Sequence, residues 1–393
     1  MPESPIRKLA PLAVAAKNRG IKVYHLNIGQ PDLPTPQCGL DALKRIDRKL
    51  LEYSPSQGFL SYREKLCGFY KKFNINVTPD DIIITAGGSE AVLYSFMACL
   101  NPGDEIIVPE PAYANYMAFA ISAGAKIKTI ATSIEEGFAL PKVEKFEELI
   151  NERTRAIMIC NPNNPTGYLY TRREMNQIRD LVKKYDLYLF SDEVYREFTY
   201  DGEKFTSLGH MKDVLDRVIM VDSVSKRFSA CGARIGTIAI RNPDFMGQVL
   251  KLCQGRLCVS RLEQVGAAGL YKTPKKYLED VNKEYKARRD TLYKALKSMD
   301  GVICEEPKGA FYVMVKAPVD DAEKFIVWML QNFDIDGETT MAAPGNGFYA
   351  TPDRGRNEMR LAYVLKNEDL VKATTILKGA LAAYPGRVEA IKA

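Results

Sequence analysis

Short apolar runs alternate with longer amphipathic stretches from about residue 80 onward, and this alternation constrains the fold more than any other feature. The apolar runs occupy residues 82–85, 105–108, 156–160, 187–190 and 218–221, with helix-like stretches at 89–100 and 172–185. Such alternation is typical of strands that return to one sheet through helices. The pattern therefore predicts an α/β fold with a mainly parallel, doubly wound sheet covered by helices on both faces.

The pattern of predicted helices and strands changes after about residue 280. A charged helix is expected at 281–296, followed by an apolar segment at 309–313, a helix near 322–333 and a last helix after Asn367. A chain of 393 residues is also long enough for two substructures. We therefore expect a large domain at 46–280 and a smaller α+β domain formed by both chain ends, 1–45 and 281–393.

Composition argues against several classes of function. The formal charge of +6 arises from 55 basic and 49 acidic residues interspersed along the chain, whereas nucleic-acid binding usually requires a concentrated basic patch. Two histidines, His25 and His210, are too few for a histidine-rich metal site. No segment approaches the roughly 18 apolar residues of a membrane span, and the charged amino terminus is not that of a signal peptide.

Cysteine usage indicates the cellular compartment. Eight cysteines are scattered without any Cys-x-x-Cys pair, and most lie in apolar surroundings. They are typical of reduced cysteines in a cytoplasmic protein rather than of a disulfide or zinc framework. An anionic small molecule is the partner that the weakly basic composition favours.

Polar clusters follow the apolar runs directly. Gly87-Gly-Ser89, Asn161 to Gly167, Asp192 to Tyr195 and Ser223 to Lys226 each begin within a few residues of the end of a predicted strand. Ligands of parallel sheets bind at the carboxyl ends of the strands. We therefore expect these four clusters to face one crevice.

Lys226 is the most reactive candidate among these residues. It lies between Ser223 and Arg234, in the run Asp222-Ser-Val-Ser-Lys-Arg-Phe-Ser-Ala-Cys-Gly-Ala-Arg-Ile-Gly236. A desolvated lysine amine can attack a carbonyl, and hydroxyl and guanidinium groups nearby suit a phosphate. The simplest hypothesis is a Schiff-base lysine that serves a phosphorylated aldehyde cofactor. A solvated surface lysine is the alternative.

Five motifs, from Asn27-Ile-Gly-Gln-Pro-Asp32 to Asn357-Glu-Met-Arg-Leu-Ala362, agree in order and spacing with one known family. The chain resembles the fold-type I pyridoxal-phosphate aminotransferases of class I/II over nearly its whole length, and is most similar to aspartate aminotransferase. The resemblance implies pyridoxal 5'-phosphate as cofactor and an amino acid and a 2-oxo acid as substrates.

The resemblance also implies which residues would hold the reactive ring of the cofactor. Lys226 would form the Schiff base and then move the substrate proton as a base. Asp192 would keep the pyridine nitrogen protonated. Tyr195 and Asn164 would bind the phenolic oxygen of the ring, and Tyr113 would stack on its face.

The cofactor phosphate would be bound at the start of a helix. Gly88 and Ser89 would supply backbone amides, and Ser223 and Arg234 would complete the site. In the family, a tyrosine of the partner subunit also contacts the phosphate, and Tyr53 matches it. A homodimer with shared active sites is therefore expected.

Substrate recognition would depend on arginine. Arg360 matches the arginine that binds the substrate α-carboxylate, beside Asn164, and Gly29 would let the backbone approach the same group. Arg256, four residues before Ser260, resembles the residue that reaches a distal carboxylate across the dimer. Arg261 competes for that role, and a helix-surface arginine is the alternative for Arg256.

These features favour an aminotransferase that acts on L-aspartate and 2-oxoglutarate. A broad-specificity or aromatic aminotransferase, or a C-S β-lyase on the same fold, remains the alternative. Only 26 residues precede Asn27, too few for the DNA-binding module of aminotransferase-like regulators, and no Gly-x-Gly-x-x-Gly motif indicates a nicotinamide dehydrogenase. Some relatives support the ring-nitrogen aspartate with a histidine; since His25 and His210 match no motif, Asp192 is expected to have another partner.

Overall fold

A seven-stranded sheet forms the centre of the larger part of the molecule. The computed structural model describes residues 4–389, and the sheet has the order β2-β8-β7-β6-β5-β3-β4. Its strands are β2 (Ile82–Thr85), β3 (Glu105–Glu110), β4 (Lys126–Ala131), β5 (Thr154–Cys160), β6 (Tyr188–Asp192), β7 (Val218–Ser223) and β8 (Gly236–Ala239). β8 runs opposite to the other six strands, which are parallel to one another. The predicted mainly parallel sheet is thus confirmed.

Alternate residues of the strands face two separate cores. In β3, Ile106 and Val108 belong to one core and Ile107 to the other. The first core includes α4 (Gly88–Cys99), α5 (Asn115–Ser122) and α9 (Pro243–Arg256), and the second includes α3 (Leu60–Lys71), α6 (Val143–Glu147), α7 (Arg172–Tyr185) and α10 (Arg261–Leu270). Because side chains of a strand alternate between its faces, both faces of the sheet are covered, as predicted.

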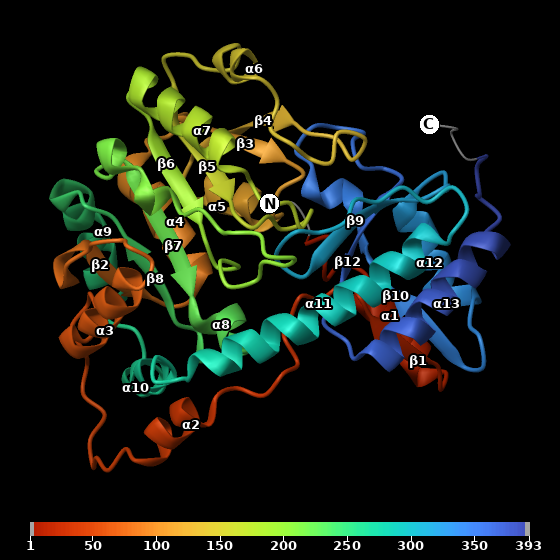
Figure 1. The fold of residues 1–393 in the computed structure, drawn as a ribbon, viewed down its shortest axis with the longest axis horizontal. Coiled ribbons are helices and arrows are strands. Elements are labelled where there is room, and N and C mark those ends of the chain that lie inside the picture. Colours follow the sequence, from red (N-terminus) through yellow and green to blue (C-terminus); the bar gives the residue numbers. More distant parts are fainter. Residues whose placement is uncertain (1–3, 390–393) are drawn as a thin grey trace.

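Two small sheets form the other part of the molecule, which lies beside the large sheet in Figure 1. One is antiparallel, with the order β11-β12-β9, and the other pairs β1 with β10 in parallel. Their strands are β1 (Lys22–His25), β9 (Tyr312–Lys316), β10 (Glu338–Met341), β11 (Ala343–Pro344) and β12 (Glu358–Ala362), and their helices are α1 (Ala10–Asn18), α12 (Ala322–Asn332) and α13 (Asn367–Ala383). Residues near the start of the chain therefore pair with residues near its end.

The proposed division at residues 45 and 280 stays a prediction. α1 packs against α12, but α2 (Gln37–Lys44) packs against α10. A Cβ added at Gly39 would lie 2.4 Å from Leu270 Cδ2, so the two helices touch closely at this glycine. The first 45 residues thus contact elements on both sides of the molecule.

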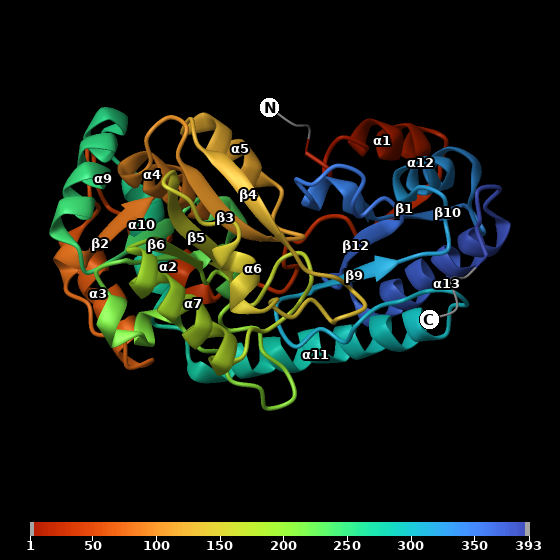
Figure 2. The same cartoon turned by 90° about the horizontal axis from the view of Figure 1, so that it is seen from above.

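A single long helix, α11 (Lys275–Lys297), runs beside both parts (Figure 2). Its fully buried Arg288 donates to Asp32 Oδ1 at 2.6 Å, and Arg289 donates to Asp201 Oδ2 at 2.5 Å. Buried arginines held by carboxylates fix the helix against loops from both parts. This helix begins after Pro274, six residues earlier than predicted. The prediction missed residues 275–280 because four of the six are charged and exposed, and only Tyr277 and Leu278 are half-buried.

The strands that carry the predicted site extend further than their apolar runs. β6 continues to Asp192 and β7 to Ser223, since Asp192 pairs with Val221 and Ser223 pairs with Gly236. Hydrogen bonds between the backbones of neighbouring strands do not depend on side-chain polarity, so the strands continue past their last apolar residue. Asp192 and Ser223 are therefore held by the sheet itself.

Within the described residues, no helix has the length and apolar character needed to cross a bilayer.

Candidate active site

The carboxyl edge of the large sheet brings the predicted polar clusters together. β2 leads to Gly87, β5 to Asn161, β6 ends at Asp192 and β7 ends at Ser223. A Cβ added at Gly88 would lie 3.8 Å from Ser223 Cβ, so the clusters after β2 and β7 adjoin. Four segments that are distant in sequence thus meet at one edge.

Lys226 lies on the single-turn helix α8 (Val224–Arg227), which begins directly after β7. Ser223 caps this turn, since its hydroxyl accepts from the Ser225 amide at 3.1 Å. The Lys226 side chain is half-buried, and its Nζ donates to the Gly29 carbonyl at 2.8 Å. The amine therefore points from the large sheet toward the segment that follows β1.

Buried charges support the turn that carries Lys226. Arg227 donates to Asp222 Oδ2 at 2.6 Å and to Glu197 Oε1 at 3.1 Å, and its side chain is fully buried. The other oxygen of Asp222 accepts from the Ser223 amide at 2.7 Å. Because breaking a buried pair leaves an uncompensated charge, this arrangement favours one conformation of the turn.

Asp192 is a buried carboxylate with a specific donor. Tyr116 donates its hydroxyl to Asp192 Oδ2 at 2.5 Å, and the Val194 amide donates to Oδ1 at 3.3 Å. Burial raises the pKa of Asp192 to about 6, and the hydrogen bond from Tyr116 opposes this rise. Tyr116 is therefore a hydrogen-bond partner of Asp192 that the sequence did not predict. No local pattern in the sequence distinguishes Tyr116 from the other tyrosines, because its contact with Asp192 spans 76 residues.

Arg360, on β12, is fully buried and joins the two parts of the molecule. It donates through Nη1 to Asn164 Oδ1 at 2.9 Å and through Nη2 to the Asn27 carbonyl at 2.7 Å. Its Nε is buried and makes no hydrogen bond with any described residue. No carboxylate within residues 4–389 forms an ion pair with it, and burial lowers the pKa of its guanidinium. A buried arginine stays charged, so this cation is suited to an anionic ligand.

Asn164 and Tyr195 lie beside Arg360. The Asn164 amide donates through Nδ2 to the Tyr195 hydroxyl at 3.4 Å, while its oxygen accepts from Arg360. The Tyr195 hydroxyl lies 2.9 Å from that of Tyr312, a residue of β9 that sequence reasoning did not single out. Tyr113 is half-buried, and its ring meets Tyr116 edge-on at 5.4 Å.

A second group of hydrogen-bond donors lies at the start of α4. Gly87 precedes the helix with a φ of +85°, and a Cβ there would lie 2.3 Å from Arg234 Nη2. The missing side chain thus lets the Arg234 guanidinium approach the helix N-terminus. With Gly88, Ser89 and Ser223 adjacent, backbone amides, hydroxyls and a cation converge where the helix dipole favours negative charge.

The remaining predicted residues make no contact with Lys226 or Arg360 among the hydrogen bonds and ion pairs of the described chain. Tyr53 is 76% exposed. Arg256 lies 3.5 Å from Glu90 Oε1 and donates to the Ser56 carbonyl at 3.3 Å. Arg261 pairs with Glu52 at 3.2 Å.

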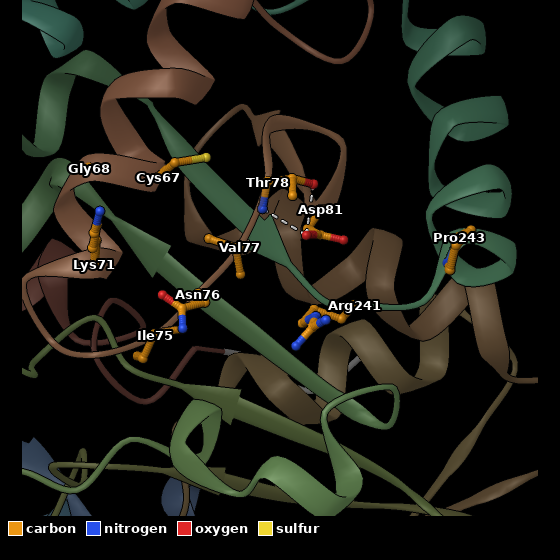
Figure 3. A pocket seen from close by; sticks show the side chains of 10 residues that line it. All are labelled: Cys67, Gly68, Lys71, Ile75, Asn76, Val77, Thr78, Asp81, Arg241 and Pro243. Carbon is orange, nitrogen blue, oxygen red and sulfur yellow. Dashed lines mark hydrogen bonds between the residues drawn. The ribbon is translucent and has the colours of Figure 1, made fainter.

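A separate hollow of about 700 Å³ lies beside α3 and the start of α9 (Figure 3). It is lined by Lys71, Thr78, Asp81 and Arg241, among others, and contains none of the predicted site residues. Asp81 Oδ2 accepts hydrogen bonds from the Thr78 amide at 2.7 Å and from the Thr78 hydroxyl at 2.9 Å. Its carboxylate therefore serves the local turn.

Comparisons with known proteins show the family of the chain. The family model described as "Aminotransferase class I and II" matches residues 21–373. A probable aspartate aminotransferase of Methanocaldococcus jannaschii is 31% identical over 363 residues, covering 90% of this chain and 92% of the relative. Aromatic-amino-acid aminotransferase 2 of Thermococcus litoralis is 31% identical, covering 94% and 93%.

Solved structures share the fold. The aspartate aminotransferase of Thermus thermophilus with maleate superposes with a TM-score of 0.88 at 28% identity, over 97% of each chain. The match includes both parts of the molecule, so the fold is that of fold type I throughout. The chain belongs to the class I and II aminotransferases, a family of pyridoxal-phosphate-dependent enzymes.

Proposed function

We propose that this protein binds pyridoxal phosphate at the carboxyl edge of the large sheet and transfers an amino group between L-aspartate and 2-oxoglutarate. The observation that carries the proposal is Arg360, a fully buried cation without a carboxylate partner in the described chain, beside Asn164 and Tyr195. An α-carboxylate would satisfy it bidentately. Amino acids and 2-oxo acids both carry that group.

The residues present fit the cofactor. Arg234, Ser223 and the first turn of α4 suit its phosphate, and the room for Arg234 depends on the missing Cβ of Gly87. Lys226 is within reach of the same edge. When bound, the cofactor supplies an electron sink that stabilises negative charge on the substrate carbon.

Each side chain would contribute a separate step. The Lys226 amine would hold the cofactor covalently and, once released, carry a proton to and from the substrate carbon. The Asp192 carboxylate would keep a proton on the ring nitrogen. Tyr195 and Asn164 would donate to the phenolic oxygen, and Tyr113 would cover one face of the ring.

The proposal includes a homodimer. Tyr53 is largely exposed in the single chain, which suits a residue that reaches the phosphate of a partner's site. Gly29 would lie near the substrate carboxylate, and Arg256 of the partner subunit would bind the distal carboxylate of aspartate. An aromatic substrate is the second candidate, because an aromatic-amino-acid aminotransferase is a relative of equal identity.

The first prediction concerns Lys226. Lys226→Ala removes the only covalent link to the cofactor, so we expect turnover to be lost and the visible absorbance of the linked cofactor to disappear. Spectra and transamination rates of the purified variant measure both effects. Lys251→Ala, which changes an exposed lysine of α9, is the control and should behave as wild type. Normal turnover in Lys226→Ala would refute the assignment.

The second prediction concerns Tyr116 and pH. In the cofactor-free protein the Asp192 pKa is raised from 3.8 to about 6, so its contribution to stability is present below about pH 3.8 and lost as pH rises through 6. The affinity for the cofactor should depend on pH in the opposite direction and rise as pH rises through 6, because the protonated ring nitrogen would need the charged Asp192 carboxylate as its partner. Tyr116→Phe removes a donor to that carboxylate, so the pKa rises further and cofactor affinity at pH 7 should fall roughly tenfold.

Cofactor titrations across pH test this. The midpoint below which affinity declines should move to higher pH in Tyr116→Phe. Tyr188→Phe removes a hydroxyl at the opposite end of β6 and should leave the midpoint in place. An unchanged midpoint in both variants would show that Tyr116 does not control the charge of Asp192.

The third prediction concerns substrate choice. Arg256→Ala should reduce transamination from aspartate to 2-oxoglutarate selectively, with smaller effects on tyrosine, alanine and methionine as donors. Because Arg256 also pairs with Glu90, Glu90→Gln controls for the loss of that pair. Arg261→Ala tests the competing arginine. Equal losses for all donors would remove Arg256 from distal-carboxylate binding.

A further inference from the structure

Tyr312 is a buried tyrosine of β9 that touches two residues of the proposed site. Its side chain is 2% exposed, and its hydroxyl lies 2.9 Å from the Tyr195 hydroxyl. The Arg360 guanidinium lies over its ring, 4.4 Å from the centroid. One side chain from the smaller part of the molecule thus contacts both the residue proposed for the cofactor oxygen and the residue proposed for the substrate carboxylate.

The hydroxyl of Tyr312 occupies space that a glycine leaves open. A Cβ added at Gly29 would lie 1.8 Å from the Tyr312 hydroxyl oxygen, and the Gly29 carbonyl accepts from Lys226 Nζ at 2.8 Å. By contrast, the Tyr363 hydroxyl, in the same part of the molecule, donates to the Ala310 carbonyl at 3.3 Å. Tyr312 therefore places its polar group among the reactive residues, whereas the Tyr363 hydroxyl bonds to the Ala310 carbonyl and lies beside the Tyr200 hydroxyl.

Either hydroxyl could donate in the hydrogen bond between Tyr195 and Tyr312, and the surrounding contacts favour Tyr312 as the donor. The Asn164 oxygen accepts from Arg360, so its Nδ2 faces the Tyr195 oxygen as a donor. A cation over the face of a phenol withdraws electron density and strengthens the hydroxyl as a donor. Tyr312 is therefore suited to donate to Tyr195. The proton of Tyr195 is then free to point toward the cofactor.

We propose that Tyr312 is a positioning residue with two separable tasks. Its hydroxyl orients the Tyr195 hydroxyl toward the phenolic oxygen of the cofactor, and its ring holds the Arg360 guanidinium in the orientation that binds a carboxylate. The inference rests on the proposed function and deepens it. A tyrosine that served only to fill the core would affect neither property independently of the other.

Two substitutions separate the tasks. Tyr312→Phe keeps the ring and removes the hydroxyl, so Tyr195 becomes a weaker donor. The pH midpoint of the visible absorbance of the Lys226-linked cofactor should then rise by roughly half a unit to one unit. The KM for aspartate should stay within about twofold of wild type. Tyr312→Leu removes the ring as well, and the KM should rise roughly tenfold.

Tyr363→Phe is the matched control, since it removes a buried hydroxyl bonded to backbone; it should leave both the midpoint and the KM unchanged. Thermal unfolding of the cofactor-free variants checks folding, and Tyr312→Met repeats the ring test if the leucine variant does not fold. A wild-type midpoint in Tyr312→Phe overturns the hydroxyl task, and a wild-type KM in the folded leucine or methionine variant overturns the ring task. Failure of the wild-type protein to bind the cofactor would instead overturn the proposed function and this inference with it.

Discussion

The hydrogen bond between Arg360 and Asn164 is the contact on which the site depends. The two residues lie 196 positions apart, one on β12 of the smaller part and one in the loop after β5 of the large sheet. A fully buried guanidinium has few ways to satisfy its donors, and here one donor goes to Asn164 and another to the Asn27 carbonyl. This requirement sets the small sheets against the carboxyl edge of the large one. Lys226, Asp192 and Tyr195 already lie along that edge.

Much of the architecture follows from local sequence. Helix α7 spans Arg172–Tyr185, the residues that amphipathic periodicity predicts, and β2 coincides with its apolar run. Strands β6 and β7 were underestimated because backbone pairing continues into Asp192 and Ser223, where hydrophobicity ends. The position of α2 against α10 was also not predicted, since it depends on close contact at Gly39 rather than on any periodic pattern.

The site was predictable where chemistry and local sequence coincide, and not where it depends on tertiary contact. Short motifs that follow strands made Lys226 and Asp192 candidates, and the structure places both at the carboxyl edge of the large sheet. Tyr116 contacts Asp192 across 76 residues, and Tyr312 contacts Tyr195 across 117. No local pattern distinguishes these tyrosines from others in the core. Arg256 and Arg261, the residues proposed for substrate choice, are likewise oriented by α9, α10 and the acidic residues beside them.

The most direct test of the central claim is the half-reaction. Wild-type protein loaded with pyridoxal phosphate is mixed with L-aspartate without any 2-oxo acid, and products and absorbance are followed together. The account predicts a stoichiometric burst of oxaloacetate, conversion of the cofactor to its aminated form, and recovery when 2-oxoglutarate is added. Continuous release of pyruvate and ammonia without an acceptor, or no product from any amino acid in a broad panel, would contradict it.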